Sequence, residues 1–209
     1  CREARTRFRL ETAQLIAIRD DVVENQSRLA AVLEGQGMVV DAGLLLVAIH
    51  DGTEAAPPPD SVVVLIDRAE SWFRLEPVTG AYDEMVNAGD VTRIQSQELQ
   101  RDLATLTADL VSEFEDQVES MDLLAEMRRQ AMGHGLLFLF SDLRSLPPTL
   151  VRVENDAVTA LVANRSYAHL LYRRTQMEVL RLEWFRGLAE QLAGTLTLLE
   201  AELVGRGAI

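Results

Sequence analysis

Lysine is absent from the 209-residue sequence, and all 20 basic residues are arginine. Cysteine occurs once, as Cys1, which excludes an internal disulfide and a cysteine-based metal site. A Walker-type phosphate loop needs lysine, and the patterns Gly-x-Ser-x-Gly of serine hydrolases and His-Glu-x-x-His of zinc proteases do not occur. These absences argue against the common enzyme classes. We therefore expect no catalytic residues and no cofactor.

Long apolar runs are also missing. The longest are Gly43–Ile49 and Leu136–Phe140, far below the 18 or more residues of a transmembrane helix, so the chain as given is not expected to span a membrane. Only 5% of the residues are aromatic, whereas 48% are hydrophobic, which is ample for a core and suits helix packing. The formal net charge of −13 argues against non-specific nucleic-acid binding, which needs a basic surface, and no nucleic-acid partner is expected.

Residues 165–203 carry the longest apolar stripe, with members three and four residues apart, as on one face of a helix. The stripe comprises Leu170, Leu171, Met177, Trp184, Phe185, Leu188, Leu192, Leu196, Leu199 and Leu203. Similar stripes predict long helices over residues 2–34 and 96–131, the second with Ser96 as its N-cap and a possible extension to Leu143. Stripes of this length need other helices to cover them.

Shorter segments fill the remainder of the chain. Gly35-Gln36-Gly37 predicts a break or kink, and a shorter helix from Met38 to His50 follows it and ends at Asp51-Gly52. Further short helices are expected over residues 61–73, where three consecutive valines would also suit a strand, and over 80–88 and 154–163. The sequence thus predicts an all-α fold, an elongated antiparallel helical bundle built on three long helices, as a single domain over residues 1–209.

Candidate metal ligands are scattered. His50, His134 and His169 sit in separate segments, and none has a second ligand at the spacing that a helical metal site requires. An acidic row on the second long helix could attract a hard cation, but such rows are common on solvated helix faces. It consists of Glu115, Glu119, Asp122 and Glu126. We expect no metal site.

Arg174 and Arg181 are the most informative polar residues, because a helical wheel places both inside the apolar arc of residues 165–203. Arginine is almost never buried unless it is paired. Either the two side chains meet polar groups of facing helices and fix the register, or they line a cleft that binds a small anion. Further polar residues interrupt the apolar stripes, which suggests a polar layer through the bundle. They are Arg19, Gln26, Gln117 and Arg128.

Two stretches, Arg2-Glu3-Ala4-Arg5 and residues 82–94, resemble an uncharacterised family of bacterial single-span membrane proteins. The start, Arg2-Glu3-Ala4-Arg5, is similar to the Trp-x-Glu-Ala-Arg-like sequence that follows the family's span. Residues 82–94 are similar to its Tyr-x-Glu-Leu-x-x-Ser-Gly-x-Leu-x-x-Ile signature, with Ala88 in place of the serine. The resemblance implies a soluble helical domain tethered to the bacterial inner membrane, with no known activity. The span would lie upstream of Cys1.

The side of the membrane follows from weaker signals. Four arginines between Arg2 and Arg9 favour the cytoplasm by the positive-inside rule, whereas a single N-terminal span commonly acts as a signal anchor and favours the periplasm, which we prefer. Cys1 is either a lipidated first residue or the point where the given chain starts, and the early onset of the helical pattern favours the latter.

Two functions remain in view. The first is a membrane-tethered helical module for protein interaction or self-association, without catalysis, because the long stripes contain polar positions and no catalytic pattern accompanies them. The second is a sensor-type domain that binds a small anion between helices near Arg174 and Arg181.

Overall fold

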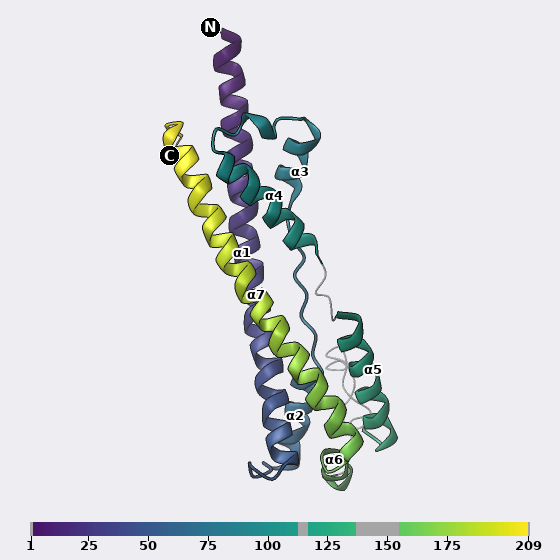
Figure 1. Cartoon of the computed structure of the whole chain (residues 1–209). Coiled ribbons are helices and arrows are strands. Elements are labelled where there is room, and N and C mark those ends of the chain that lie inside the picture. The colour runs from purple at the N-terminus through teal and green to yellow at the C-terminus, as the bar shows by residue number, and fades with distance from the viewer. Residues whose placement is uncertain (1, 113–116, 137–154, 209) are drawn as a thin grey trace, which may run out of the picture. The chain divides into compact units, whose positions relative to one another are not determined.

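The computed structural model describes residues 2–112, 117–136 and 155–208, with side chains from residue 8 onward. These residues form helices and no strand, which confirms the all-α prediction (Figure 1). The α-helices are α1 (Arg2–His50), α2 (Pro59–Ala69), α3 (Gly80–Asn87), α4 (Gln97–Val111), α5 (Gln117–Gly133), α6 (Asn155–Val162) and α7 (Arg165–Gly205), with a 3₁₀ turn, η1, at Val91–Arg93.

The chain divides into two compact units. Unit 1 consists of Cys1–Leu33, Arg74–Glu113 and Trp184–Ile209, and unit 2 consists of Glu34–Phe73 and Phe114–Glu183. Both units take residues from α1 and α7, and the single domain expected over residues 1–209 stays a prediction. Within unit 2 the two helices run antiparallel, since Gln36 contacts Glu178 whereas Gly43, later in α1, approaches Thr175, earlier in α7.

α1 is one helix of 49 residues, so the predicted end at residue 34 and the break at Gly35-Gln36-Gly37 are wrong. The reason is tertiary. A Cβ atom on Gly35 would overlap the Phe73 ring, and the neighbouring Gln36 is fully buried and donates to Glu178. These tertiary contacts offset the poor helix propensity of glycine. The helix ends where expected, at Asp51-Gly52, with Gly52 at a φ of +72°.

The buried face of α1 repeats every 3.5 residues, as in a coiled coil. Its buried members are Leu15, Ile18, Val22, Asn25, Leu29, Val32, Gln36 and Val39. Arg19 and Gln26 are the polar residues that the sequence places in the stripe of this helix, and the structure buries Asn25 and Gln36 instead.

In unit 1, polar groups of α1 hold the extended segment that leads into α3. The Asn25 side chain both donates to the Val78 carbonyl and accepts from the Val78 N–H, each at 2.7 Å. Asp21 accepts from the Ala81 N–H at 2.9 Å, at the first turn of α3. Because Asn25 is only 1% exposed, this pairing satisfies its buried side-chain amide together with two backbone groups of Val78.

The single long helix predicted over residues 96–131 is wrong, because α4 ends at Val111 and α5 starts at Gln117. The predicted N-cap is confirmed, since Ser96 Oγ accepts from the Leu99 N–H at 3.1 Å. Ser112 is extended, with a ψ of 140°, which stops α4. The possible extension to Leu143 runs beyond α5, which ends at Gly133, into residues outside the described ranges.

In unit 2, α2 and α6 pack against the parts of α1, α5 and α7 that belong to the same unit. α2 is a helix and not a strand, with Val62, Ile66 and Ala69 buried on one face, and it ends four residues before the expected Phe73. Asn164 separates α6 from α7 and accepts from the Ser166 N–H at 2.8 Å. The buried core comprises Ala42, Leu46, Val62, Ile66, Ala69, Met127, Ala131, Leu136, Val158, Leu161, Tyr167 and Leu171.

α1 contains an 18-residue window of mean hydropathy 1.7, apolar and long enough to cross a membrane by length and composition. Such a window can contain up to two charged residues, so it does not require an uninterrupted apolar run. A membrane span, a signal sequence and the core helix of a soluble protein all fit this description, and 44% of the window is buried inside the structure.

Gly35 and Gly37 provide a matched test of the packing of α1. Gly35→Ala should lower the free energy of unfolding by about 1–2 kcal/mol, because its methyl group would overlap the Phe73 ring. Gly37→Ala should raise it by up to ~1 kcal/mol, because nothing lies within 4 Å of the added Cβ and alanine is the better helix former. Urea denaturation of both variants measures this, and a destabilised Gly37→Ala would contradict the assigned helix.

Candidate functional site

Glu178 of α7 is the centre of a buried polar cluster in unit 2. Glu178 is only 1% exposed. The carboxylate accepts from Gln36 Nε2 of α1 at 2.6 Å and from Ser120 Oγ of α5 at 2.7 Å. One carboxylate therefore connects three helices of the same unit.

Arg174 and Arg181 flank Glu178 on the same helix, four residues before it and three residues after it. Arg174 Nη2 lies 3.2 Å from one carboxylate oxygen, and Arg181 Nη1 lies 3.6 Å from the other. Their side chains are 2% and 3% exposed, so the three charges are removed from water together. Such a cluster is tolerable only because opposite charges and hydrogen bonds compensate for the lost hydration.

The two guanidinium groups also bind the non-helical segment that follows α2. Arg174 donates to the carbonyl groups of Ala69 and, at 2.8 Å, Ser71. Arg181 donates to the carbonyl of Phe73 and lies over the Trp72 ring, 3.5 Å from its centroid. These carbonyl groups belong to the last residue of α2 and to the segment after it, so the arginines satisfy acceptors that the helix does not.

Burial lowers the pKa of Arg174 and that of Arg181, and the charge of Glu178 opposes this change in both cases. Arginine nevertheless stays protonated in proteins. The Nε of Arg174 has no hydrogen-bond acceptor among the described residues, so its desolvation is not fully compensated.

A second buried carboxylate, Glu70, lies next to this cluster at the end of α2. It is 4% exposed and accepts from the Tyr167 hydroxyl at 3.2 Å, and Arg128 Nε lies 3.7 Å from its other oxygen. Burial raises the pKa of Glu70 to about 7, against the lowering effects of Arg128, Tyr167 and Arg174. Carboxylates with a shifted pKa are typical of active sites, but they also occur in buried ion pairs.

Both arginines singled out from the sequence are thus in one cluster, on the buried side of α7. Their N–H groups point to Glu178 and to backbone carbonyls, which is the geometry of the structural alternative. Of the other predicted polar-layer residues, Arg128 pairs with Glu70 beside this cluster, and Arg19 pairs with the neighbouring Asp20 at 2.6 Å.

Several of the candidate metal ligands have other partners in the structure. His50 Nδ1 lies 2.7 Å from the Val162 carbonyl, and His134 lies 3.3 Å from the Asn164 amide. Glu119 pairs with Arg173, and Glu115 falls outside the described residues. Among the residues that the structure describes, no three His, Cys, Asp or Glu side chains are grouped to hold a metal.

Glu178 itself was missed, although the sequence contains a signal for it. The buried positions of α7 repeat every 3.5 residues as Leu171, Arg174, Glu178, Arg181, Phe185, Leu188, Leu192, Thr195 and Leu199. A coiled-coil repeat fitted through Arg174 and Arg181 places Glu178 between them. No local pattern marks Gln36, Ser120 or Glu70.

Comparison with known proteins adds no relative, since no protein-family model, curated protein or solved structure matches this chain.

Glu178→Gln should lower the free energy of unfolding by about 3 kcal/mol, because it leaves two buried arginines without their shared negative charge. The matched control is Glu119→Gln, whose partner Arg173 is 48% exposed and which should change stability by less than about 1 kcal/mol. Urea denaturation at neutral pH compares them. Equal losses in the free energy of unfolding would show that the buried cluster contributes no more to stability than the exposed ion pair.

Glu70→Gln tests the buried carboxylate. The pKa of Glu70 is about 7 in the folded chain, and its ordinary value, which applies to the unfolded chain, is 4.5. Between these pH values the folded chain therefore keeps a proton that the unfolded chain loses. This contribution to stability is present below pH 4.5 and lost as the pH rises to about 7. Glutamine cannot titrate. The free energy of unfolding of Glu70→Gln, relative to that of the wild type, should therefore be about 2–3 kcal/mol higher at pH 8 than at pH 4.5. A pH-independent difference would contradict the raised pKa.

Proposed function

We propose that this protein is a non-catalytic helical module that self-associates through an apolar groove of unit 2. The groove has a volume of about 430 Å³ and lies between α1 and α7. Its lining consists of Leu44, Val47, Tyr172, Thr175, Gln176, Val179 and Leu180. Leu44, Tyr172 and Leu180 are 52%, 51% and 51% exposed, which is unusual for neighbouring large side chains and is the observation that supports the proposal.

Charge favours a second copy of the chain as the partner. With a net charge of −13, two copies repel each other over most of their surfaces. None of the residues that line the groove is charged, so two copies can approach at this face without opposing like charges. The Tyr172 hydroxyl already accepts from Gln176 Nε2 at 3.1 Å, and the Thr175 hydroxyl donates to the Leu171 carbonyl at 2.7 Å.

The pattern on α7 suits a two-fold contact. Tyr172, Gln176 and Leu180 form a row at four-residue spacing, and Thr175 and Val179 form the neighbouring row. Rows of this kind interdigitate when two helices cross at about −50°. A two-fold axis would thus bring the α7 helices of two copies together, with each ridge in the groove of the other copy.

Membrane attachment stays a prediction from the family resemblance, and self-association through α7 does not depend on it. The buried cluster around Glu178 supports the proposal indirectly, since it holds α7 against α1, α5 and the segment after α2 in the orientation that exposes Leu180.

Leu180→Glu should abolish the dimer, because it places one negative charge on each side of the contact. Sedimentation velocity over a series of about 1 µM to 1 mM measures the association. The control is Val118→Glu on α5, which is 70% exposed and outside the groove, and which should dimerise like the wild type.

Cross-linking tests the symmetry. In a Cys1→Ser background, Gln176→Cys should form a disulfide between two copies on mild oxidation, and Val118→Cys should not. A chain that stays monomeric throughout the series, or a dimer that survives Leu180→Glu, would refute the proposal. Monomers that float with phosphatidylcholine vesicles and lose this on Leu180→Glu would assign the groove to lipid instead.

A further inference from the structure

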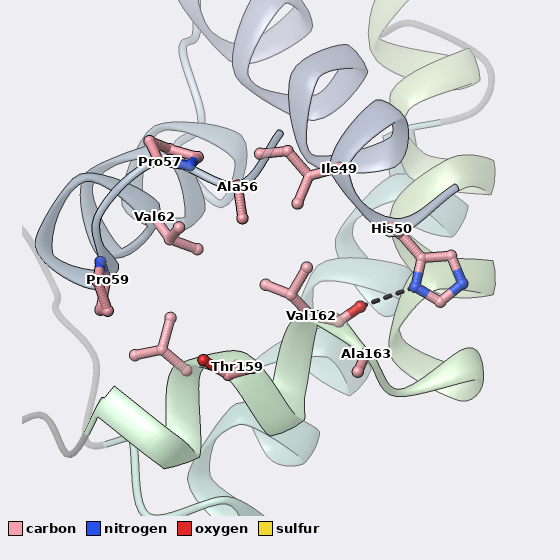
Figure 2. A pocket seen from close by; sticks show the side chains of 10 residues that line it. Ile49, His50, Ala56, Pro57, Pro59, Val62, Thr159, Val162 and Ala163 are labelled. Carbon is pink, nitrogen blue, oxygen red and sulfur yellow. Dashed lines mark hydrogen bonds between the residues drawn. The ribbon is translucent and has the colours of Figure 1, made fainter. Parts of the chain in front are cut away.

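A second concave site lies in unit 2, at the His50 end of α1. It is a cavity of about 240 Å³, open to the surface, between α1, α2, α6 and the Ala56-Pro57 segment that leads into α2 (Figure 2). Most of its wall is small or branched and apolar, from Ala56, Pro57, Pro59, Val62, Val158 and Val162. Small side chains leave the space, and none of the lining residues has a carboxylate or guanidinium group.

The two polar side chains of the wall, His50 and Thr159, each make a hydrogen bond within the protein. His50 Nδ1 lies 2.7 Å from the Val162 carbonyl, so this nitrogen carries the proton and donates, and the dashed line in Figure 2 marks the contact. The Thr159 hydroxyl donates to the Asn155 carbonyl at 3.1 Å. The Pro58 carbonyl accepts from Ser61 and Val62, at 2.8 and 3.2 Å.

Water gains little in such a cavity. A buried water needs two to four hydrogen-bond partners, and proline nitrogens have no N–H to offer. The wall therefore presents mainly carbon, which favours an apolar occupant. Apolar cavities of about 150 Å³ in other proteins take up benzene, and this cavity is larger.

We propose that this cavity binds an uncharged apolar moiety of about ten non-hydrogen atoms, such as a bicyclic aromatic ring or the end of an alkyl chain. The site is independent of the groove at Leu180, because the two have no lining residue in common. Occupancy would fix the end of α1 against α2 and α6, the elements that form the wall.

Two probes separate the two sources of such a moiety, indole for a planar ring and 1-octanol for an alkyl chain. Thermal unfolding of the full chain with increasing probe is the measurement. At about ten times its dissociation constant, a bound probe should raise the Tm by about 3–5 °C.

Ala163→Leu places a larger side chain at the cavity wall, which should occupy the space of the probe and remove the rise in Tm. Ala160→Leu is the matched control, since Ala160 is exposed on α6 and does not line the cavity, and the rise should persist. Methyl NMR of the wild type provides evidence without a variant, because the signals of Val62, Val158 and Val162 should shift on titration. No rise in Tm with either probe, a rise that survives Ala163→Leu, or valine signals that do not move would each overturn the proposal.

Discussion

The Glu178 carboxylate is the group on which unit 2 depends. It is buried between two arginines of its own helix and receives hydrogen bonds from α1 and α5. Removing three charged side chains from water costs several kcal/mol for each ion, and only close opposite charges with further hydrogen bonds offset this cost. The arrangement is therefore demanding. α7 can slide or rotate against its neighbours in unit 2 only by separating buried charges from their partners, so the cluster specifies one packing.

The same two arginines determine the path of the chain after α2. Because Arg174 and Arg181 supply donors to the carbonyls of Ala69, Ser71 and Phe73, the segment can leave the helix without leaving acceptors unsatisfied. Phe73 is thereby placed over Gly35, where only a missing side chain makes room for its ring. The charge cluster and the unbroken helix α1 are thus parts of one arrangement.

In the proposed function, the buried polar cluster and the exposed apolar groove of unit 2 act together. The polar cluster directs the charged seam residues of α7 inward, and the opposite side of the helix leaves Tyr172 and Leu180 half exposed without charged neighbours in the groove. An arrangement in which charges are buried and apolar side chains are exposed is unfavourable for an isolated chain in water. It becomes favourable when a second copy covers the apolar face.

The sequence by itself determined the all-α fold, the Ser96 cap, the glycine that ends α1 and the burial of Arg174 and Arg181. These features follow from local periodicity and from the residue preferences of helix ends, which a single segment expresses. Tertiary structure alone decided that Gly35-Gln36-Gly37 stays helical, that Asn25 and not Gln26 faces inward, and that Glu178 joins Gln36 and Ser120. The physical reason is distance along the chain. Gln36 and Glu178 are 142 residues apart, and no local pattern states which of two adjacent helical rows a remote partner will cover.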